Sequence, residues 1–248
     1  MVEIAVLIKQ VPDTSAKIEV SDGMVDLSSV KWITSPYDEF AIEAALQHKE
    51  SEGGTVTAIT LGPESCDKAL KDAKAIGVDN LVRVWNSNWS YMDSHAIQSA
   101  LAQAVSNIGA SVVYCGKSAA DTGAGSTGPG VAQKLGWPSL SNIVGIKFDG
   151  DSLEVTQPGS KGQSILGVSI PALISCDKGM NEPRRANVRG IMMAKKATIE
   201  VIDNISTNSN VGLVGHSSPP EKPPGKTFEG AENIPHVVKL LRDEAKII

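Results

Sequence analysis

Short apolar runs alternate with helical segments through the first 136 residues, and this alternation limits the fold more than any other feature. The apolar runs have the length and the Val, Ile and Leu content of strands that are buried on both faces. They lie at residues 2–9, 55–62, 80–85 and 111–117. The helical segments lie at residues 35–54, 63–77, 93–108 and 127–135. This alternation predicts an α/β fold with a mostly parallel sheet that is covered by helices on both faces.

The pattern changes after Trp137 and Pro138. Residues 142–158 and 164–176 are strand-like runs broken by short turn segments. They predict an antiparallel addition to the sheet.

The first helix has a recognisable start signal. Ser35 is expected at the N-cap and Pro36 at the first helical position, and Asp38 completes the spacing of a capping box. Phe40 and Leu46 belong to the apolar stripe that should face the core.

Composition excludes several classes of protein. The formal net charge of −5 argues against a general nucleic-acid binder, whose domains carry a positive excess. The longest apolar runs fall far short of the about 20 residues that a membrane span needs. The apolar run at the start is also too short for a signal peptide, and Cys66, Cys115 and Cys176 have the spacing of reduced thiols rather than of metal ligands. We therefore expect a cytoplasmic protein with three buried cysteines and no direct membrane insertion.

Residues 116–127, GKSAADTGAGST, follow one predicted strand and open the next helix. Open α/β sheets bind ligands at the carboxyl ends of their strands. Glycines let backbone N–H groups approach an anion, and a helix that starts at Ser126 and Thr127 offers its N-terminus to a phosphate. The stretch therefore predicts a nucleotide-binding loop.

The same loop fits the GxGxxG dinucleotide fingerprint through Gly123, Gly125 and Gly128. In an NAD(P) site, however, the glycines follow the strand directly, whereas here KSAADT intervenes. The acidic residue at the required distance, Asp149, lies in an FDGD turn rather than at a strand end. Both points disfavour an NAD(P) dehydrogenase.

Residues that could break bonds or bind a metal are few. The four histidines are not spaced with cysteines or carboxylates as ligand sets, and we expect them on solvent-exposed faces. The Walker A, GxSxG and HExxH patterns do not occur in the sequence. The sequence predicts neither catalytic residues nor a metal site. The histidines are His48, His95, His216 and His236.

Residues 177–197 form a basic segment in this acidic protein, with six cations against two acids. Such a patch steers an acidic partner toward one face of the molecule. Met180 is expected to project from a loop as an adaptable apolar contact, and Pro183 is expected to start a helix. The alternative is a solvated helix face above a buried Met180.

The C-terminal region differs from the rest. Residues 216–228 hold four prolines and few apolar side chains, which predicts a stiff linker that could extend roughly 40 Å. Beyond it, Ile234, Val238 and Leu241 lie at helical spacing on one stripe. This helix either packs on its own domain or binds another chain, and the long linker favours binding to another chain. We expect a domain at 1–203 and an arm at 204–248.

The segment MNEPRRANVRGIMMAKKATIEVI, residues 180–202, resembles the signature of the electron transfer flavoprotein β subunit. The likeness covers residues 1 to about 203, and it includes SPYDEFAIEAAL, ITLGP and GKSAADTGAGST in that order. The resemblance implies a Rossmann-like domain in a heterodimer with an α subunit that carries the redox-active FAD. It also implies AMP bound structurally in this chain or, in bifurcating members, a second FAD in its place.

Contacts carried over by position place the adenine nucleotide against the first and second strand ends, the first helix and the glycine-rich loop. The implied cofactor-binding residues are Leu7, Ser35, Pro36, Tyr37, Asp38, Leu61, Gly116, Lys117, Ser118, Ala119, Ala120, Asp121, Thr122, Gly123, Ala124, Gly125, Ser126 and Thr127. The family also docks dehydrogenases transiently through an apolar residue at the position of Met180 and through the cations that follow it. The implied docking residues are Met180, Asn181, Glu182, Pro183, Arg184, Arg185, Arg189, Lys195 and Lys196.

Two alternatives stay open at this stage. Bifurcating members resemble DGDTAQVGP in the loop, whereas residues 121–129 read DTGAGSTGP, which favours AMP without excluding a second FAD. A stand-alone nucleotide-binding module of the universal stress type would explain the loop, but it would explain neither the basic segment nor the proline-rich arm.

Overall fold

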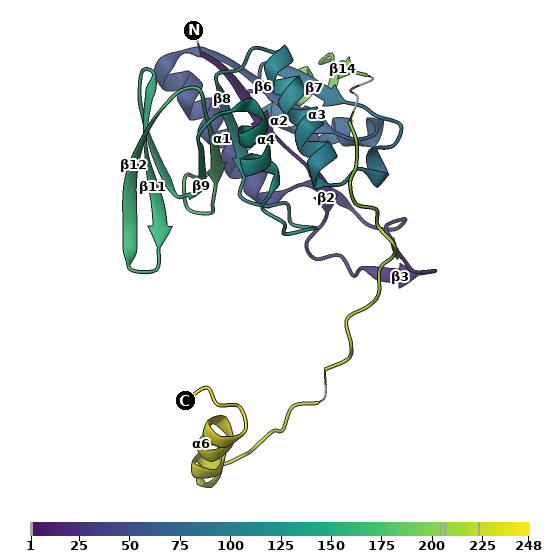
Figure 1. Cartoon of the computed structure of the whole chain (residues 1–248), viewed down its shortest axis with the longest axis vertical. Helices are drawn as coiled ribbons and strands as arrows, with labels where there is room; N and C mark the ends of the chain where they lie inside the picture. Colours follow the sequence, from purple (N-terminus) through teal and green to yellow (C-terminus); the bar gives the residue numbers. More distant parts are fainter. Residues whose placement is uncertain (1, 204, 206, 223) are drawn as a thin grey trace.

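The computed structural model describes residues 2–203, 205, 207–222 and 224–248. Its central element is a seven-stranded sheet with the order β14-β7-β6-β1-β8-β13-β9, in which every neighbouring pair is parallel (Figure 1). The predicted α/β fold with a mostly parallel sheet is confirmed. The strands are β1 (Val2–Leu7), β6 (Gly54–Leu61), β7 (Asn80–Val84), β8 (Val112–Gly116), β9 (Ser139–Ile143), β13 (Ala172–Cys176) and β14 (Glu200–Ile202).

Helices cover both faces of this sheet, as the alternation in sequence predicts. Successive side chains of a strand point to opposite faces, and β1 shows the consequence: Ile4 and Val6 belong to one core cluster, Ala5 and Leu7 to the other. The first cluster includes apolar residues of α1 and α2, and the second includes those of α3 and α4. The helices are α1 (Pro36–Glu52), α2 (Asp67–Ile76), α3 (Ser94–Asn107), α4 (Thr127–Leu135) and α5 (Val188–Lys195), with short 3-10 turns η1 (Glu64–Cys66) and η2 (Trp89–Tyr91).

The antiparallel addition is present, but it forms a sheet of its own. It consists of β10 (Gly145–Asp149), β11 (Ser152–Gly159) and β12 (Gly162–Ser169). The second half of the predicted run at 164–176 is instead β13, a parallel strand of the main sheet. Two small pairs complete the structure: β2 (Gln10–Pro12) with β5 (Trp32–Thr34), and β3 (Glu19–Ser21) with β4 (Met24–Asp26).

His48 does not lie on a solvent face, contrary to the prediction from sequence. It is fully buried, its Nδ1 lies 2.9 Å from the Tyr114 hydroxyl oxygen, and its ring stacks on Phe148 at 4.7 Å. Phe148 belongs to β10, so the antiparallel sheet covers a face of α1 that helical periodicity alone assigns to solvent. Burial lowers the pKa of His48. The other three histidines are exposed, as predicted.

Two local predictions about helix starts are wrong. Helix α5 begins at Val188 rather than at Pro183, and the Asn187 side chain caps it by accepting a hydrogen bond from the Gly190 N–H at 2.8 Å. The capping box at α1 does not form either. Pro36 does occupy the first turn, but in the residues that the structure describes Ser35 makes no side-chain cap, and the Asp38 carboxylate bonds to other segments.

The segment expected as an arm at 204–248 stays in contact with the domain over its first part and extends away from it after that (Figure 1). Figure 1 shows helix α6 (Ile234–Asp243) at the end of a long extended segment, well apart from the sheet and its helices. A short 3-10 turn, η3 (Ala231–Asn233), precedes it, and none of the residues of α6 is buried. Before it extends away, the segment expected as an arm contacts the domain at several residues. Ile205 is buried in a core cluster, and the N–H groups of Asn210 and Val211 donate to the Asp93 carboxylate at 2.6 and 3.0 Å. The His216 N–H donates to the Gly23 carbonyl at 2.7 Å. Among the described residues, each helix is too short or too polar to cross a membrane.

Candidate functional site

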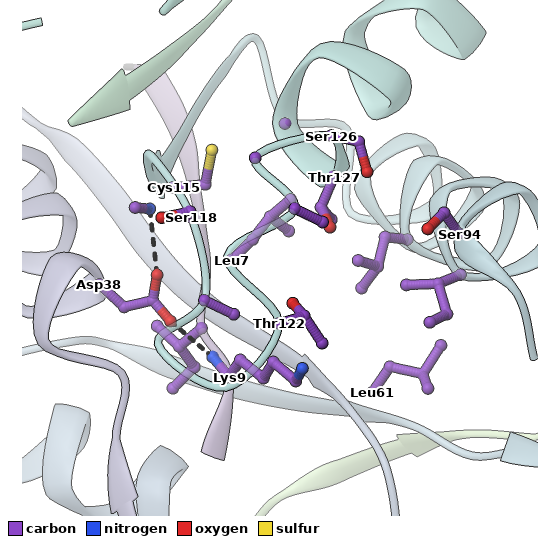
Figure 2. A pocket seen from close by; sticks show the side chains of 18 of the residues that line it. Leu7, Lys9, Asp38, Leu61, Ser94, Cys115, Ser118, Thr122, Ser126 and Thr127 are labelled. Atoms are coloured by element: carbon purple, nitrogen blue, oxygen red, sulfur yellow. Dashed lines mark hydrogen bonds between the residues drawn. The ribbon is translucent and has the colours of Figure 1, made fainter. Parts of the chain in front are cut away.

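A cavity of about 320 Å³ lies at the carboxyl ends of β1, β6 and β8, the edge at which an open α/β sheet binds ligands (Figure 2). Its lining joins the end of β1, the first turn of α1 and the loop between β8 and α4. The structure thus brings together most of the residues that the sequence predicts for nucleotide binding. Those that line the cavity are Leu7, Asp38, Leu61, Gly116, Lys117, Ser118, Ala119, Thr122, Ala124, Gly125, Ser126 and Thr127.

Six of the predicted residues surround the cavity without lining it. Ser35 is buried behind it, and the Tyr37 ring lies under the Lys117 ammonium, 4.7 Å from ring centroid to Nζ. Asp121 turns toward Lys9 and forms an ion pair with it at 2.7 Å. The contacts of Tyr37 with Lys117 and of Asp121 with Lys9 thus involve two residues of the cavity lining. The six are Ser35, Pro36, Tyr37, Ala120, Asp121 and Gly123.

The sequence prediction missed one wall of the cavity. That wall comes from the segment between β7 and the first turns of α3, which begins where a predicted strand ends and therefore reaches the same edge of the sheet. The signal that could have found this segment is its position after a predicted strand, because its sequence has no glycine-rich pattern. This wall contributes Trp89, Ser90, Met92, Ser94, Ile97 and Leu101. The other lining residues that the prediction did not include are Ile8, Lys9, Cys115 and Gly128.

The lining divides into an apolar part and a hydroxyl-bearing part. Leu7, Leu61 and Leu101 are apolar contacts of the kind that a planar base requires. Ser118, Thr122, Ser126 and Thr127 contribute hydroxyl groups along the loop (Figure 2). Such a pocket, apolar with a few convergent polar groups, has the character of a small-molecule site.

The N-terminus of α4 is available to an anion, whereas that of α3 is already occupied. At α3, the Asp93 carboxylate accepts hydrogen bonds from the N–H groups of Ala96 at 2.8 Å and Asn210 at 2.6 Å. At α4, within the described chain, Ser126 forms no side-chain cap, and Pro129 has no N–H. The uncapped donors of the first turn are therefore those of Thr127 and Gly128, which both line the cavity. Partial positive charge at such a terminus favours a phosphate.

Glycines let the loop fold closely around the cavity. Gly123 and Gly125 have φ angles of 61° and 62°, a left-handed conformation that most other residues adopt only with strain. Gly128 permits α4 to approach the sheet, because a Cβ there would lie 2.7 Å from the Cys115 Sγ. The glycine content is therefore a requirement of this backbone path.

Asp38 is the buried charged group of the cavity. Its Oδ2 accepts a hydrogen bond from the Lys9 N–H at 2.7 Å, and its Oδ1 accepts one from the Gly116 N–H at 3.1 Å (Figure 2). Burial raises the pKa of the carboxyl to about 7, although both hydrogen bonds act in the opposite direction. Asp38 thus titrates near neutral pH.

The basic segment at 177–197 is held to α1 over its first half. The Arg184 Nε donates to Glu43 at 2.7 Å, and its Nη1 donates to Glu50 at 2.5 Å. The Asn181 side-chain amide donates to the Phe40 carbonyl at 3.0 Å. Met180 does not project freely but is half-buried and packs against the core. These contacts also keep the chain extended where a helix was predicted.

The exposed part of the segment is its second half. Of the predicted docking residues, Glu182, Arg185, Arg189, Lys195 and Lys196 are exposed, while Met180, Asn181, Pro183 and Arg184 are half-buried. The sequence prediction did not include the apolar face of α5. Its signal in the sequence is the run of three apolar residues at 191–193, Ile-Met-Met. This face consists of Val188, Ile191, Met192 and Met193, with exposed fractions of 76%, 45%, 65% and 57%.

Comparison with known proteins agrees with these features. Residues 22–206 match the family model described as the electron transfer flavoprotein domain. The chain is 32% identical to the electron transfer flavoprotein subunit beta of Bacillus subtilis, over 98% of each chain. It is also 32% identical to the acryloyl-CoA reductase electron transfer subunit gamma of Anaerotignum propionicum, over 92% of this chain and 93% of that one. Protein FixA of Azorhizobium caulinodans is 34% identical, over 80% of this chain and 74% of its own.

Replacing Arg184 by Met should destabilise the domain. The Glu43 side chain is only 5% exposed, so removing its cation leaves a buried charge without compensation, and we expect a loss of about 3 kcal/mol in the free energy of unfolding. Arg185→Met is the matched control, because Arg185 is exposed and has no ion-pair partner among the described residues; its effect should stay within about 0.5 kcal/mol. Chemical denaturation measures both, and equal losses would contradict a stabilising role for the ion pair between Arg184 and Glu43.

Proposed function

Because this chain belongs to the electron transfer flavoprotein family, as a β subunit, we propose that it binds AMP in its cavity and assembles with an α subunit that holds the redox-active FAD. The observation that carries the AMP proposal is the cavity at the sheet edge, with apolar walls and with the open N-terminus of α4 beside it. FAD, when bound in the complex, supplies the electron-carrying chemistry. The residues of this chain bind and orient a nucleotide, and we assign none of them a catalytic role.

The size of the cavity supports AMP over a second FAD. Its volume of about 320 Å³ lies at the small end of ligand pockets, which range from roughly 300 to 1,000 Å³. A mononucleotide suits such a space, whereas a dinucleotide with an isoalloxazine ring needs considerably more. The ion pair between Lys9 and Asp121 also ties the loop to the end of β1 and limits its opening.

Charge at the cavity suits a single phosphate. Lys117 is held by Asp177 at 2.9 Å, and Lys9 is held by Asp121, so both ammonium groups are largely neutralised by their partners. The remaining positive potential comes from the N–H groups of α4 and of the glycine-rich loop. We infer that the phosphate lies beside Ser126 and Thr127, with the base toward Leu7 and Leu61.

The nucleotide content of the native complex tests this proposal. We expect the denatured heterodimer to release one FAD and one AMP, as measured by chromatography against standards. Two FAD and no AMP would show that the cavity opens to hold a second flavin. The complex would then be of the bifurcating type rather than a carrier with one redox-active FAD.

We further propose that dehydrogenases dock on residues 177–197. The exposed apolar face of α5 lies among Arg189, Lys195 and Lys196, which gives one patch both an apolar contact and a positive charge. Charges at the edge of such a patch accelerate encounter without prolonging the complex. Met180 anchors residues 177–197 to the domain, because it packs against the core.

Reversing one charge on this patch should slow electron delivery. We expect Lys195→Glu to lower the second-order rate of flavin reduction by the dehydrogenase about tenfold at low ionic strength, and the deficit should shrink as salt is added. Lys222→Glu in the arm makes the same change of net charge outside the patch and should act weakly. Equal effects of the two variants in stopped-flow measurements would exclude a local docking site.

The arm is proposed to bind the α subunit. Helix α6 exposes Ile234 and Val238 by 58% and 36%, and it lies apart from its own domain, so its apolar stripe is available to another chain (Figure 1). The extended linker provides the reach that such a contact requires.

Removing residues 217–248 should therefore weaken assembly and leave the domain folded. The cut preserves the hydrogen bond from His216 to Gly23, so we expect the thermal unfolding of the isolated domain to be unchanged. The dissociation constant for the α subunit should rise at least tenfold in a titration by calorimetry. Lys239→Gln, on the polar side of α6, is the control and should assemble normally. Loss of domain stability on truncation would mean that the arm belongs to this fold.

A further inference from the structure

The walls of the nucleotide cavity meet at one buried carboxylate. Asp38 lies in the first turn of α1 and is 6% exposed. Its two oxygens accept hydrogen bonds from two different segments, the end of β1 through the Lys9 N–H and the end of β8 through the Gly116 N–H. Three segments that are far apart in sequence are thereby fixed to one another at the cavity.

Each of the two N–H groups belongs to a residue that carries part of the site. The Lys9 side chain reaches across to Asp121 in the glycine-rich loop, so fixing the Lys9 backbone also fixes that ion pair. Gly116 is the first residue of the loop itself. The carboxylate lies directly on it, since a Cβ at Gly116 would be 2.4 Å from the Asp38 Oδ1. The loop therefore starts from a position that Asp38 sets.

We propose that Asp38 is the positioning residue of the nucleotide site and that protonation of its carboxylate weakens nucleotide binding. The inference rests on the proposed AMP function of this cavity. An ionised carboxylate accepts both hydrogen bonds through its two oxygens. In a protonated carboxyl, one oxygen carries the proton, so it donates a hydrogen bond and is a poor acceptor. One of the two N–H groups then loses its acceptor in a buried place, where an unpaired polar group is unfavourable. Either Lys9 or Gly116 is released, and the loop loses its fixed origin.

The surroundings of Asp38 place this protonation near neutral pH. Burial raises the pKa of its carboxyl to about 7, and the charge of Asp121 adds to the increase, whereas Lys9 opposes it. From β8 and β13, Cys115 and Cys176 face the same region, and burial raises the pKa of both thiols, so they stay neutral. Asp38 is then the group that changes charge here between pH 6 and 8.

Stability and binding should respond to this proton in opposite directions. The folded pKa lies above the unfolded value of 3.8, so the folded protein holds the proton more tightly than the unfolded chain does. The contribution of Asp38 to stability is therefore present at low pH and is lost as the pH rises toward 7. Nucleotide affinity, by contrast, should increase over the same pH range. A carboxylate that merely stabilised the fold would not show this opposition.

The test uses the heterodimer freed of its nucleotide and measures the binding of AMP by equilibrium dialysis at pH 8 and pH 6. If only the ionised form is competent, the wild-type dissociation constant should rise about tenfold at pH 6, in proportion to the lost competent fraction. Asp38→Asn keeps the size of the side chain, and its amide mimics the protonated state. It should bind at least tenfold more weakly than the wild type at pH 8, and its own dissociation constant should change little between pH 8 and pH 6. Glu39→Gln, on the adjacent exposed residue, is the control and should keep the wild-type profile.

A second ligand separates the titration of Asp38 from that of the AMP phosphate. The AMP phosphate itself titrates near pH 6, whereas adenosine has no such group, so the wild-type response should persist with adenosine. Unfolding experiments complete the test, and Asp38→Asn should be at least as stable as the wild type at pH 8. Identical pH profiles of wild type and Asp38→Asn would overturn the inference alone. A wild-type complex that binds no AMP at pH 8 would overturn the proposed function and the inference together.

Discussion

Parallel pairing around β1 is the constraint on which the site depends. β1 lies between β6 and β8, and Leu7 is opposite Ile59 on one side and Cys115 on the other. Because parallel strands all end at the same edge, each connecting loop begins there as well. The same pairing continues to β13, where Cys176 is opposite Gly116. The glycine-rich loop and the basic segment at 177–197 therefore start side by side, and the ion pair between Lys117 and Asp177 joins them at 2.9 Å.

Helix α1 attaches both segments through acidic side chains. Glu43 holds the basic segment through Arg184, and Asp38 holds the glycine-rich loop through backbone N–H groups. The two carboxylates are both buried, but only Glu43 has a guanidinium as its partner. The cation compensates the burial of Glu43, whereas Asp38 has two neutral donors, a pKa of about 7 and only the more distant charge of Lys9. The same helix thus carries one carboxylate paired with a cation and one whose charge responds to pH.

Sequence patterns predicted those parts of the fold that depend on periodicity. The alternating runs predicted β1, β6, β7 and β8 and the helices α1 to α4, because burial on one or two faces determines the spacing of apolar residues. The glycine-rich loop was likewise predictable, since its backbone path needs residues without a Cβ. Most of the cavity followed from these two features together with the resemblance.

The failures have one physical cause, which is tertiary contact that local pattern does not record. Asp38 has capping-box spacing, yet its carboxylate bonds to β1 and β8 because the sheet edge presents two N–H groups without other acceptors. His48 has the spacing of a solvent-exposed face, yet Phe148 covers it from a strand one hundred residues further along the chain. Pro183 looks like a helix start, but Arg184 is already engaged with Glu43. In each case a polar group that a local rule assigns to a cap, to solvent or to a partner protein is used within the domain. Arg184 illustrates the consequence for function: a cation can be read as part of a docking surface only after its intramolecular partners are known, so the exposed cations of α5 remain the stronger candidates for contact with a dehydrogenase.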